Sequence, residues 1–160
     1  MALTSTSATI DAVELNNVLH KDPSLSPSFR FKGSPEPLLL YIVSNVDSMI
    51  ECSSIRQYYQ HHLLPPLPVF IHHLYRYCHL TPSVLVVALI YLKRLKTKLP
   101  CQSQGEYDTP YKLFLAAVLL ALKYIEDSKK HISLLYHVVS PLYTRNDLNE
   151  MERSFLGKSH

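Results

Sequence analysis

The 160-residue chain contains little glycine and no tryptophan. Three glycines are too few for a sandwich or barrel that depends on many tight turns, and too few for a glycine-rich loop that cradles phosphate. Long apolar runs are also absent, since the two most apolar stretches, residues 84–92 and 113–122, are much shorter than the roughly 18 residues that a membrane-crossing helix needs. We therefore expect these stretches to be helices buried in a protein core.

The chain also has no large excess of one charge, and its number of cysteines is small and odd. Sixteen basic residues against 13 acidic ones give a net charge of +3, which is too small an excess to indicate nucleic-acid binding. Cys52, Cys78 and Cys101 are odd in number and widely spaced, which fits reduced thiols inside a cell better than a disulfide framework. The N-terminal residues include Asp11 and Glu14 and have no basic segment followed by an apolar one, so we expect neither a secretory signal nor a transit peptide.

Hydrophobic residues make up 47% of the chain, enough for a single domain with a core that needs no disulfide or metal. Residues 1–32 are rich in Ser and Thr, and we expect a disordered or weakly helical arm there. We place the domain at residues 33–157 and a short tail at 158–160.

Apolar residues recur every three or four positions along the domain, which is the period of a helix. No strand-like alternation of useful length is visible. The pattern predicts helices at about residues 37–52, 69–78, 82–96, 110–127, 131–139 and from 144 onward, the last one cut short at Gly157 after barely three turns.

Three of these helices carry start signals. Thr81 and Thr109 each precede a proline, which places an N-cap hydroxyl directly before a proline at the first helical position. Thr144 and Asp147 have the spacing of a capping box. The helices that follow Thr81 and Thr109 are apolar on nearly all sides, so both should be enclosed by others. We predict an all-α bundle with these two helices at its centre.

Motifs for catalysis or metal binding are missing. The sequence has no G-x-S-x-G, no P-loop and no complete zinc-ligand spacing; its nearest approach is Cys78-His79 beside His72-His73. The carboxylate pairs Glu126-Asp127 and Glu150/Glu152 could be read as acid and base, but most carboxylates at such places are simply solvated. We therefore expect neither an enzyme nor a cofactor, and no small-molecule ligand.

Lys123 is less easily explained, because it follows ten consecutive apolar residues. One interpretation is a lysine that reaches water at a helix C-terminus, where its charge favours the helix dipole. The other is that its ammonium group emerges at the edge of the bundle and binds carbonyl groups of a partner protein.

Several ordered segments resemble the cyclin box, and in particular the fungal Pcl-type cyclins, relatives of the phosphate-regulon cyclin. The resemblance covers roughly residues 38–156. It rests on Leu85-Val86-Val87-Ala88-Leu89-Ile90-Tyr91-Leu92-Lys93-Arg94-Leu95, Leu99-Pro100, Gly105, Thr109, Phe114-Leu115-Ala116-Ala117, Ala121-Leu122-Lys123-Tyr124, Asp127-Ser128, Leu148-Asn149-Glu150-Met151-Glu152 and Phe155-Leu156.

The resemblance implies a single cyclin-box bundle of about five helices around a central third helix, with an extra N-terminal helix outside it. It also implies a regulatory subunit that binds and activates a cyclin-dependent kinase by repositioning the kinase αC helix, in cell-cycle or phosphate signalling, in the nucleus or cytoplasm. Lys123 and Glu152 occupy the positions that clasp the kinase backbone, and we assign Tyr124 and Glu126 to the same kinase-binding surface.

The sequence departs from the family pattern in three places. Lys93 stands where the family has a structural Asp, and residues 65–68 replace the segment that docks substrates in cell-cycle cyclins. The shortened last helix should leave apolar core surface uncovered, which would weaken the fold in the absence of the kinase. The alternative function is a non-activating helical adaptor or a degenerate cyclin-fold fragment.

Overall fold

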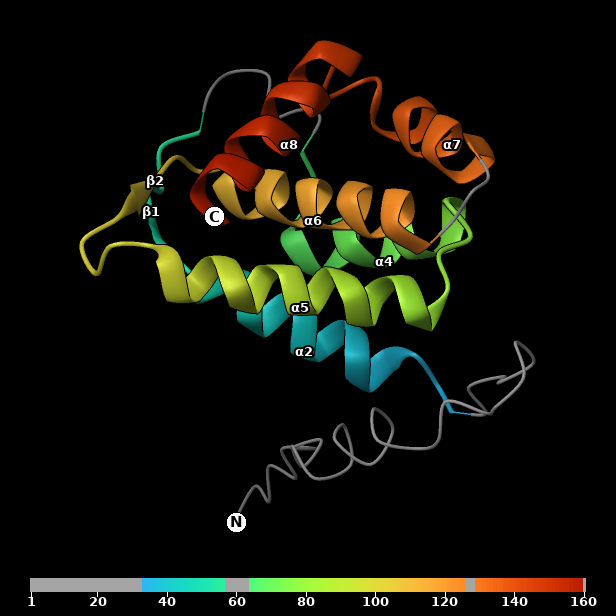
Figure 1. The fold of residues 1–160 in the computed structure, drawn as a ribbon, viewed down its shortest axis with the longest axis horizontal. Helices are drawn as coiled ribbons and strands as arrows, with labels where there is room; N and C mark the ends of the chain where they lie inside the picture. The colour runs from blue at the N-terminus through green and yellow to red at the C-terminus, as the bar shows by residue number, and fades with distance from the viewer. Residues whose placement is uncertain (1–32, 57–63, 126–128, 160) are drawn as a thin grey trace. The chain divides into compact units, whose positions relative to one another are not determined.

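The computed structural model describes residues 33–56, 64–125 and 129–159. The chain divides into two units, residues 1–37 and 38–160, and only residues 33–37 of the first are described. The predicted N-terminal arm, residues 1–32, therefore lies outside the described residues. Within the second unit the described chain is mostly helical, with two very short strands (Figure 1), so the predicted all-α class is confirmed.

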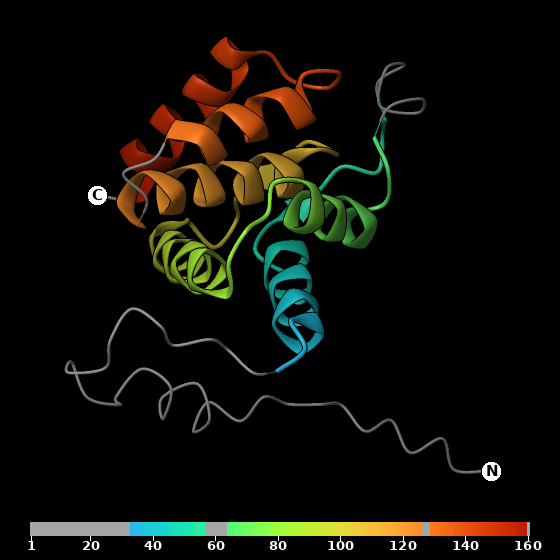
Figure 2. The same cartoon turned by 90° about the vertical axis from the view of Figure 1, so that its right-hand side faces the viewer.

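A central helix, α6, organises the described part of the bundle. The described helices are α2 (Glu36–Asp47), α4 (Leu67–Tyr77), α5 (Pro82–Lys98), α6 (Thr109–Ile125), α7 (Lys129–Val139) and α8 (Arg145–Ser159). Helix α6 packs against α4, α5, α7 and α8, and two perpendicular views show it between α5 on one side and α7 and α8 on the other (Figures 1 and 2). This is the predicted five-helix bundle with its third helix, α6, at the centre, and α2 is the extra N-terminal helix.

The two apolar helices differ in how far they are enclosed. Eleven residues of α6 are buried, including every position from Phe114 to Leu122. Helix α5 buries one face, formed by Val84, Leu85, Ala88, Leu89, Leu92 and Leu95, while the basic residues of its second half are exposed. The prediction that α5 is enclosed like α6 is wrong. The first half of α5 is apolar on nearly all sides, but its second half has apolar residues on one side only and basic residues on the other.

The first described helix is shorter than predicted. Helix α2 ends at Asp47, and the chain then turns into β1 (Glu51–Cys52), which pairs in parallel with β2 (Gln104–Gly105). Met49 is buried although it lies in the turn. The apolar residues that suggested a helix as far as Cys52 therefore lie in a turn and a very short strand, and Met49 among them is part of the core.

Two of the predicted N-caps are confirmed. The backbone N–H of Val84 donates to the Thr81 hydroxyl at 3.3 Å, at the start of α5. At the start of α8, Asp147 N–H donates to the Thr144 hydroxyl at 3.1 Å, while Thr144 N–H donates to the Asp147 carboxylate at 2.7 Å. This reciprocal pair is a capping box with Asp in the usual position of Glu.

The prediction that Thr109 caps its own helix is wrong. Thr109 is already inside α6, and its hydroxyl accepts a hydrogen bond from Glu106 N–H at 2.8 Å. The preceding residue, Asp108, is fully buried, accepts a hydrogen bond from the Tyr143 hydroxyl at 3.0 Å and lies 3.3 Å from Lys112 Nζ. This buried carboxylate ties the start of α6 to the segment between α7 and α8.

The last helix is longer than predicted. Helix α8 continues through Gly157 to Ser159, because one glycine costs a helix only about 1 kcal/mol and buried residues such as Leu148 and Phe155 hold it to the core. Beside it a cleft of about 610 Å³ reaches core residues of neighbouring helices, including Leu95 and Ala116.

The two glycines at described positions with contrasting surroundings give a paired prediction. A Cβ atom on Gly105 would lie 2.8 Å from Thr109 Oγ1 and 2.9 Å from Thr109 Cβ, whereas one on Gly157 would meet nothing within 4 Å. We expect Gly105→Ala to lower the free energy of unfolding by about 1–3 kcal/mol through overpacking. Gly157→Ala should raise it by about 0.5–1 kcal/mol, because alanine is the better helix former. Urea denaturation followed by circular dichroism measures both, and a change of the same sign in the two variants would contradict the packing around Gly105.

Candidate functional site

Lys123 lies in the last turn of α6, directly after the buried run that ends at Leu122. The helix emerges from the core at this point, so a side chain here reaches the surface while its stem stays against the bundle. Its side chain is 42% exposed. A cation in the last turn also interacts favourably with the partial negative charge of the helix C-terminus.

Glu152 comes from the middle of α8, one turn after the fully buried Leu148. Packing of Leu148 and Phe155 against the core fixes the rotation of α8 about its axis. Because residues four apart lie on the same side of a helix, this rotation brings Glu152 to the edge of the contact between α8 and α6. Its side chain is only 15% exposed.

The two side chains form a direct ion pair with two hydrogen bonds. Lys123 Nζ donates to Glu152 Oε1 at 2.9 Å and to Oε2 at 2.7 Å. An ammonium group carries three N–H donors, so one donor remains for another acceptor, and the carboxylate oxygens keep further lone pairs. The pair can therefore accept an N–H and donate to a C=O of the same partner chain, which is the pattern that a peptide backbone presents.

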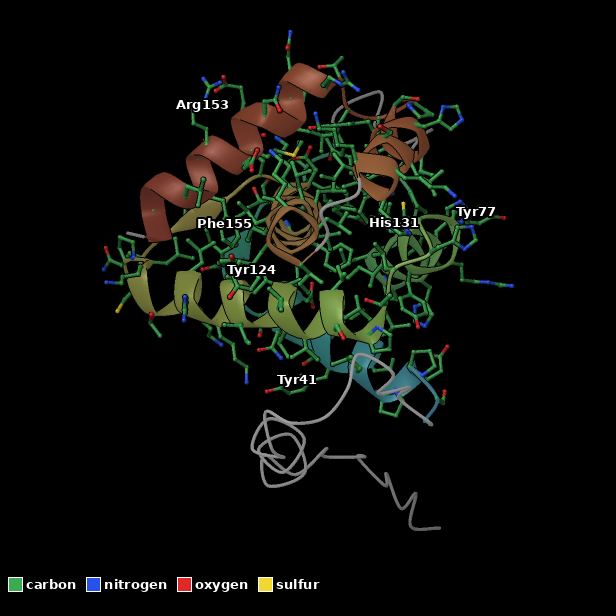
Figure 3. The ribbon with its side chains drawn as sticks, turned by 45° about the vertical axis from the view of Figure 1, so that its right-hand side comes forward. Tyr41, Tyr77, Tyr124, His131, Arg153 and Phe155 are labelled. Atoms are coloured by element: carbon green, nitrogen blue, oxygen red, sulfur yellow. The ribbon has the colours of Figure 1, made fainter. Side chains whose placement is uncertain are left out.

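Apolar side chains flank the ion pair. Tyr124 follows Lys123 and is 75% exposed; in Figure 3, where α6 is seen nearly end-on, it lies between the end of α6 and α5. Ile125 and Leu156 are also partly exposed, and Leu156 lies one turn beyond Glu152 on α8. Apolar groups around a paired charge exclude water when a partner binds, which strengthens the charged contacts.

The structure thus brings together two of the four residues predicted for the kinase-binding surface, Lys123 and Glu152. Tyr124 follows Lys123 on α6 and lies on the side of α5 (Figure 3). Glu126, the fourth, lies outside the described residues, as does Asp127. Ile125 and Leu156 were not among the site residues predicted from the sequence. The spacing of four residues between Glu152 and Leu156 was the available signal, because it places both on one side of a helix.

The other candidate groups are held elsewhere. Glu150, which could have formed an acid–base pair with Glu152, instead binds Arg153 at 2.9 Å, and both side chains of that pair are largely exposed. Figure 3 shows Arg153 pointing away from the body of the molecule. Within residues 33–56, 64–125 and 129–159, no three His, Cys, Asp or Glu side chains come close enough to hold a metal ion.

The three cysteines differ in their surroundings. Burial raises the pKa of the Cys78 thiol to about 12, and burial also raises the pKa of Cys52, whereas Cys101 is exposed. None of the three is in a disulfide. Among the described helices, none combines the length and the hydrophobicity that a membrane-crossing helix needs.

The amino-acid sequence matches a known protein family. Residues 41–158 match the family model described as cyclin, N-terminal domain. The chain is 36% identical over 93 residues to PHO85 cyclin-1 of Saccharomyces cerevisiae, which is 58% of this chain and 33% of that protein. It is 25% identical over 129 residues to PHO85 cyclin-2 of the same yeast, which is 80% of this chain and 42% of that protein.

The chain spans less than half the length of either of these relatives. No solved structure matches it significantly. The family match includes Lys123, Tyr124, Glu152 and Leu156, so the ion pair and its apolar neighbours lie inside the matched domain.

The burial of Glu152 predicts an asymmetric effect on stability. We expect Lys123→Ala to lower the free energy of unfolding by about 1–2 kcal/mol, because it leaves a mostly buried carboxylate unpaired. Glu152→Ala should cost only about 0.5–1 kcal/mol, because the more exposed ammonium can be hydrated. Chemical denaturation at low and at high salt measures both.

Arg153→Ala is the matched control for this measurement, since it breaks an exposed ion pair on the same helix. We expect it to change stability by less than about 0.5 kcal/mol. Equal effects of all three substitutions would show that the burial of Glu152 has no energetic consequence.

Proposed function

The chain belongs to the cyclin family, as its sequence predicted, and from that premise we propose that it is a regulatory subunit that binds and activates a cyclin-dependent protein kinase. The observation that carries the proposal is the Lys123–Glu152 pair, which stands at the surface where α6 and α8 meet. Both relatives are named PHO85 cyclins, so we propose a kinase of that type as the partner.

In the proposed complex, Lys123 and Glu152 form hydrogen bonds with backbone groups of the kinase near its αC helix. The remaining N–H of Lys123 donates to a kinase carbonyl, and Glu152 accepts from a kinase N–H. Tyr124 and Leu156 cover these contacts from water, and we propose that Glu126 extends the same surface. Moving the αC helix allows the kinase to form its Lys–Glu ion pair, which phosphoryl transfer requires.

The internal pairing of the two side chains favours this role energetically. Each long side chain that is immobilised on binding costs about 0.5–1.5 kcal/mol of entropy. Lys123 and Glu152 are already held by two hydrogen bonds, so much of that cost is met when the cyclin domain folds. A preorganised pair also fixes the positions of the positive and the negative charge. A partner backbone can then bind in one direction only, with a C=O group at Lys123 and an N–H group at Glu152.

This role implies where the protein acts. We propose that it works in the nucleus or the cytoplasm, where a kinase of this type meets its substrates, and in cell-cycle or phosphate signalling. The non-activating adaptor would use the same domain to hold a partner without moving the αC helix. Kinase binding and kinase activity must therefore be measured separately.

The first test is co-purification with a co-expressed PHO85-type kinase. We expect Lys123→Ala and Glu152→Ala each to weaken kinase binding by at least about tenfold, because each leaves a desolvated partner group unpaired. Glu150→Ala removes a carboxylate from the exposed side of the same helix and should leave binding unchanged. Loss of kinase phosphorylation activity in parallel with binding supports activation, whereas binding without any gain in activity would establish the adaptor instead.

A charge exchange separates contact with the kinase from a structural role. The double variant Lys123→Glu, Glu152→Lys keeps an internal ion pair but reverses the positions of the two charges. We expect stability close to that of the unchanged chain, and kinase binding that stays as weak as in the single variants. Recovery of binding together with stability would contradict a direct contact between this pair and the kinase.

A further inference from the structure

The exposed side of α5 carries a concentration of positive charge that the proposed kinase contact does not use. Its second half contains four exposed basic residues, and the whole helix contains no Asp or Glu. We call these four residues the basic patch: Lys93, Arg94, Lys96 and Lys98. None of them forms an ion pair with a carboxylate of the described chain.

Helix polarity accounts for only part of this patch. Lys96 and Lys98 lie in the last turn, where cations offset the partial negative charge of the helix C-terminus. Lys93 and Arg94 lie further back, where that effect has faded. Four like charges close together repel one another, so an uncompensated patch of this kind is unfavourable for the isolated chain and favourable for an acidic partner.

The positive charge of the patch affects the neighbouring Tyr41 of α2. The ammonium of Lys93 lies 5.0 Å from the centre of the Tyr41 ring. This cation–π contact holds the Lys93 side chain against α2. Hydrogen bonding to Lys93 lowers the pKa of Tyr41 below its ordinary value, and the positive charges of Lys93 and Lys96 act in the same direction. A negative charge is therefore stabilised beside α2 and α5.

A cleft lies next to the basic patch, and Lys96 belongs to both. Lys96 is one of the residues that line a cleft of about 660 Å³ at the end of α5, together with Met49, Ile50, Leu99 and Pro100. This volume is in the range of pockets that accommodate a peptide side chain or a small ligand. Glu51 is the acidic residue of the lining, so its charge opposes that of Lys96.

We propose that this surface docks an acidic peptide segment of a partner protein, whose carboxylates contact the basic patch and whose apolar side chain enters the cleft lined by Lys96. Charge complementarity selects the acidic segment, and the apolar part of the cleft lining selects the hydrophobic residue. The proposal goes beyond kinase binding, because the surface lies on α2, α5 and the turn after α2, whereas the Lys123–Glu152 pair lies on α6 and α8.

The test uses the full chain alone and a short fluorescein-labelled peptide that is rich in glutamate and has one central leucine. Fluorescence anisotropy at several salt concentrations measures binding, which should weaken as salt rises because exposed charges are screened. Lys93→Ser with Lys96→Ser should weaken binding about tenfold, the loss of two surface charge contacts. Glu51→Gln should strengthen binding, because it removes the opposing charge from the cleft.

The matched control removes the same number of charges elsewhere. Arg76→Ser with Lys129→Ser takes two exposed cations from α4 and α7 and should leave peptide binding nearly unchanged. An equal loss in this control would overturn the proposal, because attraction would then depend on net charge only. Replacing the peptide leucine by serine should also weaken binding, and an unchanged affinity would remove the cleft from the docking site.

Two further results would overturn the proposal. One is no measurable binding of the acidic peptide at low salt. The other is equally tight binding of a labelled oligothymidylate with the same dependence on Lys93 and Lys96, which would mark the patch as a general polyanion site. Because kinase is absent from every sample, failure here leaves the proposed kinase contact untouched.

Discussion

The enclosure of α6 is the constraint on which the rest of the molecule depends. A helix with a continuous buried run from Phe114 to Leu122 has no face that can stay in water, so four helices must cover it. Burying each large apolar side chain contributes on the order of 1.5–3 kcal/mol, and this gain fixes both the position and the rotation of α8. The surface pair at Lys123 and Glu152 exists only because that packing is satisfied.

Charged groups lie at both ends of α6, in different surroundings. At its start, the buried carboxylate of Asp108 joins α6 to Tyr143 and Lys112, which secures the connection to the segment between α7 and α8. At its end, Lys123 pairs with Glu152 at the surface, where both groups keep hydrogen-bonding capacity. The polar group at one end is therefore buried, and the pair at the other end is at the surface.

Local patterns predicted the described helices well, and they failed where a choice depended on distant residues. The capping box at Thr144 needed only its own neighbours, and the structure has it. At the start of α6, the Thr109 hydroxyl accepts from Glu106 N–H, and the neighbouring Asp108 is engaged with Tyr143, which is 35 residues away in the chain. Met49 faces the core from a turn that local helical spacing could not distinguish from a continued helix.

The amino-acid sequence alone determined the class of the fold, the enclosed third helix and the residue types at Lys123 and Glu152, because hydrophobic spacing and family motifs are properties of the linear chain. The tertiary structure decided that these two side chains meet, because the residues lie 29 positions apart on helices whose rotation is set by core packing. It also decided what surrounds Lys93. The sequence showed a reversed charge there, but only the tertiary structure placed that charge over the ring of Tyr41 on α2.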